Sequence, residues 1–208
     1  MKGSAPPCRH SERGQSLVEF SLLVPAFMLV LVSLLEFGLF FNHYLTLEYA
    51  TREGARVGAA LANGGSASNS SCDSALPPSP GQPGTVDPYV IAAVQRVLES
   101  SGSPVVMSDI SKITITQYGT SNTNTWVYNK GAGPIVDGKP LDFTQSGATG
   151  WSDCARNNGA NPDSIVVSIA YTYHWETPLA SLLGFWGGAA AAQTPISDST
   201  TMALNPFQ

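Results

Sequence analysis

The sequence predicts an α+β protein. It should consist of a long N-terminal transmembrane helix that extends out of the membrane, followed by a small domain with one helix and a three- to four-stranded antiparallel sheet. Three observations carry this prediction. An apolar run begins near residue 17, residues 90–98 show one helical apolar face, and the last part of the chain alternates apolar and polar residues.

The apolar run covers residues 17–41 and holds no charged residue between Phe20 and Leu35. A helix crosses a bilayer with about 20 mostly apolar residues. A single span must be helical, because lipid offers no partner to free backbone groups. We therefore expect a helix over residues 15–62, of which residues 17–41 form the transmembrane part. The Asn-Gly-Gly sequence after residue 62 ends it.

Charge predicts the orientation of this span. The chain of 208 residues has a net charge of -5 and only 12% charged residues, which excludes a basic surface suited to nucleic acid. Residues 1–14 are different, because three basic residues against Glu12 give a local net charge of +2. Positive charge before a first span keeps that end in the cytoplasm. We expect a single-pass protein with most of the chain outside.

Three residues within the span need an explanation. Glu19 lies in its first turn, where a carboxylate complements the positive helix N-terminus by ~0.3–1 kcal/mol. Pro25 removes a backbone donor and is expected to kink the helix. Glu36 costs ~1–3 kcal/mol in a bilayer unless it reaches water or a partner. Two interpretations of Glu36 stay open, snorkelling to the interface and pairing inside a subunit assembly.

Small residues follow one stripe of the helix beyond the membrane. Ala50, Gly54, Gly58 and Ala62 recur every four residues, a spacing that lets another helix or a sheet approach closely. Two glycines would otherwise only weaken the helix, by about 1 kcal/mol each. The regular spacing favours packing.

Three sequence blocks occur in order along residues 13–57: Arg13-Gly-Gln-Ser-Leu-Val-Glu-Phe-Ser-Leu-Leu-Val-Pro, Leu35-Glu-Phe-Gly and Ala50-Thr-Arg-Glu-Gly-Ala-Arg. Together they resemble the TadE-like family, the minor pseudopilins of the bacterial tight-adherence (Flp) pilus. Gly14, five residues before Glu19, also resembles the processing site of type IV prepilins. The resemblance implies that a prepilin peptidase cuts between Gly14 and Gln15 and removes the basic leader 1–14.

The resemblance also implies a role, partners and a location. Glu19 would pair with the new amine of Gln15, in its own or a neighbouring subunit. The implied partners are the prepilin peptidase, other pilins and pseudopilins, the assembly machinery and the lipid bilayer of the bacterial inner membrane. The implied function is structural, in pilus biogenesis and adherence, with no enzymatic activity. Entry into the surface fibre stays open.

The sequence lacks the usual patterns of catalytic and metal sites. Its three histidines have no cysteine or carboxylate at metal-ligand spacing, and it has no Gly-x-Ser-x-Gly or phosphate loop. The oxygen-rich loop 153–163 could hold calcium but lacks EF-hand spacing, so an ordinary polar turn is the favoured interpretation and calcium binding stays open. We expect no enzyme, metal or cofactor. The alternative function is a signal-anchored extracytoplasmic ligand-binding module that is not cut at Gly14.

Residues 63–86 are rich in Gly, Ser and Pro, a composition typical of a linker. Residues 87–208 form the predicted extracytoplasmic α+β domain. Its helix begins with Asp87 as N-cap. Its clearest strand is 164–175, and further strands are expected near 113–116, 126–128 and 196–204.

Two other features of the outer part have open interpretations. Cys72 and Cys154 are a candidate disulfide in an oxidising compartment. It would close a loop of about 80 residues, worth ~4 kcal/mol in the chain-entropy model, and two unpaired thiols are the alternative. The apolar stretch 179–186 is either a buried short helix or, if exposed, a contact with the membrane surface or a partner.

Overall fold

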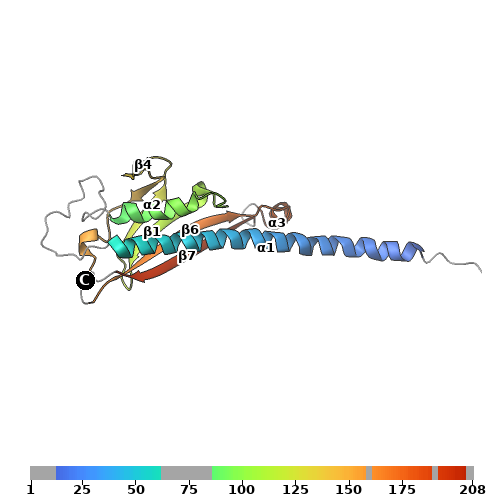
Figure 1. Ribbon diagram of the computed structural model, residues 1–208. Coiled ribbons are helices and arrows are strands. Elements are labelled where there is room, and N and C mark those ends of the chain that lie inside the picture. The colour runs from blue at the N-terminus through green and yellow to red at the C-terminus, as the bar shows by residue number, and fades with distance from the viewer. Residues whose placement is uncertain (1–12, 62–85, 158–160, 189–191, 205–208) are drawn as a thin grey trace, which may run out of the picture.

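The computed structural model describes residues 13–61, 86–157, 161–188 and 192–204 and has the expected α+β fold. A long helix, α1 (Arg13–Leu61), and a second helix, α2 (Val86–Leu98), lie on one face of an antiparallel sheet (Figure 1). The predicted linker lies outside the described residues except for its last residue. So do Cys72 and the side chain of Cys154, and with them the candidate disulfide.

The sheet has five strands in the order β5-β2-β1-β6-β7, and every neighbouring pair is antiparallel. It is thus larger than expected by one or two strands, because β5 has only four residues and shows no alternation that the sequence could reveal. The strands are β1 (Ile110–Gln117), β2 (Thr123–Tyr128), β5 (Phe143–Ser146), β6 (Ser164–His174) and β7 (Gln193–Ala203).

Five short elements complete the described part of the domain. A two-stranded hairpin is formed by β3 (Ile135–Val136) and β4 (Lys139–Pro140), beside α2. Two 3-10 turns, η1 (Met107–Asp109) and η2 (Asp153–Ala155), precede β1 and β6. A nine-residue helix, α3 (Leu179–Gly187), lies between the long strands β6 and β7.

The core forms where α1 and α2 cover the sheet. On β6, Ile165 and every second residue after it up to Tyr173 are buried, as a strand with one face on a core requires. The buried face of α2 includes Val90, Val94 and Leu98, each four residues after the one before. These apolar side chains join those of α1 in one cluster.

The helix α1 has 49 residues and continues through Pro25 without interruption. Its two halves differ in burial. Before Glu36 its large apolar side chains are mostly exposed, whereas from Glu36 onward one face packs against α2, β6 and β7. Figure 1 shows the first half projecting alone from the domain.

The stripe of small residues lies where α1 crosses α2 and β6. Ala50 is fully buried. A Cβ atom added to Gly54 would lie 2.6 Å from Val94 Cγ2 and 3.3 Å from Val167 Cγ1. A Cβ at Gly58 would lie 2.5 Å from the Ile165 side chain. The backbones approach closely because these positions carry no side chain. Ala62 lies outside the described residues.

Gly54→Ala should destabilise the protein by about 1–2 kcal/mol, because overpacking against the stiff Val94 side chain outweighs the gain in helix propensity. Gly38→Ala is the matched control on the same helix, since nothing lies within 4 Å of its added Cβ. Denaturant unfolding of the full chain in detergent micelles measures both. Equal stability of the two variants would contradict the close packing at Gly54.

Candidate functional site: the N-terminal helix and its junction with the domain

The first half of α1 is an uncovered apolar surface. The helix over Ser16–Leu61 is long and apolar enough to span a membrane, with a mean hydropathy of 2.3 in its most apolar stretch, none of which is buried. Leu22, Phe27 and Leu34 are among the exposed side chains. A soluble monomer rarely exposes so large an apolar surface. This helix is consistent with a single-pass membrane protein.

The residues of the predicted processing site lie at the free end of this surface. Gly14 and Gln15 belong to the first turn of α1, and Glu19 is exposed on the next turn. Gln15 and Glu19 are four residues apart, so they lie on the same side of the helix. No described part of the domain reaches this end of α1 (Figure 1).

Glu36 joins the exposed half of α1 to the covered half. Its side chain is only 2% exposed. Oε1 accepts hydrogen bonds from the Tyr173 hydroxyl at 2.5 Å and the Glu176 backbone N–H at 3.1 Å. Oε2 accepts one from the Thr177 backbone N–H at 2.9 Å. The carboxylate is thus buried rather than snorkelling, and its hydrogen-bond partners among the described residues are donors of its own chain. Pairing of Glu36 inside a subunit assembly stays a prediction.

Tyr173 is held as a donor to Glu36. Burial raises the pKa of the Tyr173 hydroxyl, and its hydrogen bond to Glu36 raises that pKa further. The hydroxyl therefore keeps its proton at any physiological pH. The ring packs edge-on against Phe40 of α1, with centroids 5.4 Å apart, and so adds an apolar contact to the polar one.

His43 extends the junction about two turns further along α1. It is buried, and its Nδ1 lies 2.9 Å from the Leu39 carbonyl oxygen, to which it donates. Its ring stacks on Tyr171 at 5.8 Å, and its Nε2 lies 3.7 Å from Glu176 Oε1. Polar groups of α1 and of the β6–α3 connection thus meet at two places on the helix, about two turns apart.

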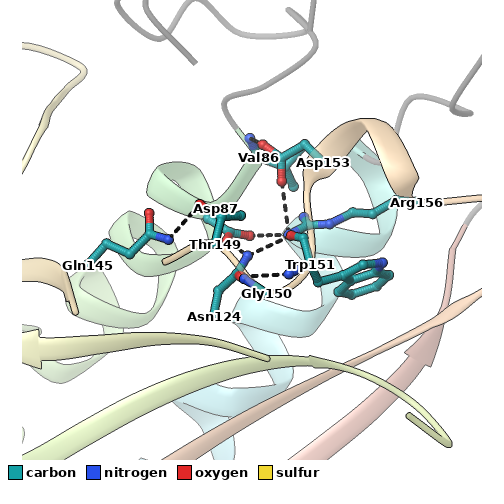
Figure 2. A network of polar contacts seen from close by, with 9 residues as sticks. All are labelled: Val86, Asp87, Asn124, Gln145, Thr149, Gly150, Trp151, Asp153 and Arg156. Atoms are coloured by element: carbon teal, nitrogen blue, oxygen red, sulfur yellow. Dashed lines mark hydrogen bonds and ion pairs between the residues drawn. The ribbon is translucent and has the colours of Figure 1, made fainter. Parts of the chain in front are cut away.

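A second buried polar cluster lies near the start of α2, away from this junction (Figure 2). Arg156 is fully buried and pairs with Asp87 and, at 2.9 Å, with Asp153. Asn124 donates to Asp87 at 2.5 Å. The guanidinium carbon of Arg156 lies 4.6 Å from the centroid of the Trp151 ring. That cation–π contact adds to the interactions of the guanidinium, whose Nε and Nη1 have no hydrogen-bond partner among the described residues.

This cluster caps α2 from a distant part of the chain. The helix begins at Val86, so Asp87 is not the N-cap that the sequence predicted. Asp153 instead accepts the Val86 N–H at 2.9 Å, while Asp87 turns inward to Arg156. Burial raises the pKa of Asp153 to about 6, although Arg156 opposes this change. The cluster fixes the 150–156 segment on α2.

The described part of the chain contains no group of three or more His, Cys, Asp or Glu side chains arranged to hold a metal ion. In the loop 153–163, Asp153 binds Arg156, and Asp163 accepts the Asn157 backbone N–H at 2.9 Å. Residues 158–160 of this loop lie outside the described residues.

A protein-family model described as TadE-like protein matches residues 14–56. This segment is TadE-like. The resemblance predicted from the three sequence blocks is thereby confirmed, and it supports a protein associated with the Tad pilus. Comparisons with curated proteins and with solved structures gave no match.

The TadE-like segment begins at Gly14 and ends at Arg56. It therefore includes the exposed half of α1, Glu36 and most of the helix that the domain covers. The partners of Glu36 lie outside it, on β6 and the connection to α3. Sequence reasoning missed them because Tyr173 belonged to a clear strand, and nothing in the pattern showed where that strand meets α1.

Glu36→Ala should lower the free energy of unfolding by about 2–4 kcal/mol, because one buried donor and two partly buried donors lose their acceptor. Tyr173→Phe, which removes one donor, should cost about 1 kcal/mol. The matched control is Glu48→Ala, which removes only a partly exposed pair with Arg52 and should change stability by less than about 0.5 kcal/mol. Urea unfolding of the full chain in micelles checks this order, and a Glu36→Ala effect no larger than that of Glu48→Ala would exclude the junction as a stabilising element.

Asp153 should make the free energy of unfolding fall as the pH rises, which is the opposite of the usual effect of a carboxylate. Its pKa in the folded protein, about 6, lies above the ordinary value of 3.8, so the folded state binds this proton more tightly. The resulting stabilisation is present below about pH 4 and is lost as the pH rises through about 6. Asp153→Asn keeps an acceptor for the Val86 N–H but removes this titration.

The free energy of unfolding of the wild type, relative to that of Asp153→Asn, should therefore fall by up to about 3 kcal/mol between pH 4 and pH 7. Thermal unfolding in micelles across this range measures the difference. Asp137→Asn, which removes an exposed carboxylate beside Arg96, is the matched control. Parallel pH profiles for the wild type and Asp153→Asn would contradict this prediction, because they would show that Asp153 has the same pKa in the folded and the unfolded protein.

Proposed function

We propose that this chain is a minor pseudopilin-like assembly protein of the bacterial Flp (Tad) pilus. It is inserted in the inner membrane with its N-terminus in the cytoplasm and is processed after Gly14 by a prepilin peptidase. One observation carries the proposal: the TadE-like match begins at Gly14, on a helix whose first half no described part of the chain covers. The role is structural rather than catalytic.

The uncovered half of α1 suits a pseudopilin-like protein both while it lies in the membrane and after it has joined other pilins. It extends from Ser16 to Leu35, which is 20 residues and about 30 Å of helix, the thickness of the hydrocarbon core. In the membrane this surface is covered by lipid, and in an assembly it can be covered by the helices of other pilins. The basic leader supports the cytoplasmic position of the N-terminus.

Glu19 has a specific task after processing. Cleavage between Gly14 and Gln15 creates an amine at Gln15, about 6 Å along the helix axis from Glu19. A carboxylate at this spacing can bind the amine of its own chain or that of a neighbouring subunit. Such a pair offsets the cost of placing either charge near hydrocarbon. Subunits without the cleaved N-terminus lack this partner, so processing and assembly are coupled.

The domain is carried as a rigid extension of the membrane helix. Glu36 and His43 fasten the β6–α3 connection to α1, and the stripe around Gly54 fastens α2. The outer surface of the domain is therefore presented at a fixed height above the span. Other pilins and the assembly machinery are the proposed partners of the helix.

The test is the intact mass and N-terminal residue of the protein, expressed with and without a prepilin peptidase. We expect a chain that starts at Gln15 only when the peptidase is present, and no cleavage of Gly14→Ala. Gly38→Ala is the matched control and should be cut like the wild type, because Gly38 is exposed and has no neighbour near its Cβ position. Glu19→Ala should be cut but should lose pilus assembly.

A chain that keeps residues 1–14 under all of these conditions would refute the proposal. It would favour the signal-anchored ligand-binding module instead. Normal pili and normal adherence in cells that lack the protein would also count against the assembly role.

A further inference from the structure

The helix α3 lies at the point along α1 where the uncovered half ends. Glu36 binds the backbone N–H groups of Glu176 and Thr177, and α3 begins at Leu179, two residues later. In Figure 1, α3 lies at the end of the domain from which the first half of α1 projects. A span that begins at Ser16 crosses the hydrocarbon within about 20 residues and ends at Leu35. The hydrogen bonds of Glu36 therefore hold α3 at the outer boundary of the bilayer.

The composition and exposure of α3 are unusual for a helix that faces water. Its nine residues include no charged side chain. Phe185 is 86% exposed, more than Phe27 in the middle of the span, which is 61% exposed. A helix of this length is too short to cross a membrane. An apolar helix with aromatic residues is instead suited to lie in the membrane interface.

The apolar surface also continues along α1 past the end of the span. Phe37 and Phe41 are exposed, four residues apart, with ring centroids 6.2 Å apart. Phe37 and Trp175 border an apolar cavity of about 150 Å³ between α1 and the ends of β6 and β7. The lipid-facing surface of α1 is thus continuous with an apolar surface that the domain itself provides next to α3.

The charges of this region indicate which kind of lipid contact it can make. No lysine or arginine follows Arg156 in the sequence, and the charged side chain closest in sequence to α3 is Glu176. Attraction to anionic headgroups therefore contributes nothing here, and the contact must be apolar. A phospholipid bilayer needs no basic patch to accept an uncharged apolar helix.

We propose that α3, together with Phe37 and Trp175, forms a membrane platform that inserts into the outer leaflet beside the span. The occupant of this surface is the acyl and glycerol region of phospholipid, bound through apolar contact and without preference for anionic headgroups. The proposal rests on membrane insertion of α1, which is part of the proposed function, but not on processing or on the pilus. It gives the domain a second attachment to the bilayer.

The test is photo-crosslinking of the full chain in phosphatidylcholine liposomes. The photoreactive residue is introduced as Phe185→benzoylphenylalanine, and the adducts are identified by mass spectrometry. The same residue at Phe27 reports the span. At Tyr118, which is 68% exposed in the β1–β2 turn at the other end of β1 from the junction, it reports an exposed aromatic position in water. Because all three side chains are exposed, the fold should tolerate each change, and protection from protease checks this.

We expect lipid adducts at residue 185 with a yield comparable to that at residue 27 and many-fold above that at residue 118. Replacing part of the phosphatidylcholine with phosphatidylglycerol should leave the yield unchanged. A yield at residue 185 as low as that at residue 118, or adducts to a second copy of the chain, would overturn the membrane platform alone. Failure at residue 27 as well would overturn it together with membrane insertion of α1.

Discussion

The carboxylate of Glu36 determines where the domain sits on its helix. An acidic side chain at the end of an apolar run is costly unless its oxygen atoms are bonded, and here both oxygen atoms accept from the segment that follows β6. The aromatic packing of Tyr173, the position of α3 and the division of α1 into an uncovered and a covered half all follow from this contact. The sequence places Glu36 inside the apolar run 17–41, whereas the structure shows it at the point where α1 passes from its exposed half to its covered half.

The parts of the fold that the sequence could predict are those with local causes. The apolar run of α1, the spacing of the small residues and the alternation along β6 each repeat over several turns or residues, and each repeat reflects a surface that one element must bury. The strand β5 has no such signal, because four residues are too few to show a period.

The site was predictable only at its N-terminal end. Gly14 and Glu19 belong to a contiguous pattern, and the TadE-like match covers both. The partners of Glu36 are separated from it by 137 residues or more, so no local rule could connect them. The predicted N-cap of α2 was wrong for the same reason. Asp153, which is 67 residues away from Val86 in the sequence, accepts the Val86 N–H in place of the locally favoured Asp87.

The continuity of α1 has a geometric consequence for the orientation of the domain. A straight helix advances by about 100° per residue, so the face of the span and the face of the domain keep a fixed angular phase. Adding one residue before Glu36 would leave the fold of the domain unchanged and yet turn it by about 100° relative to the span, whereas seven added residues would nearly restore the original direction. The number of residues in the exposed half of α1 thus sets the direction in which each face of the domain points relative to that half.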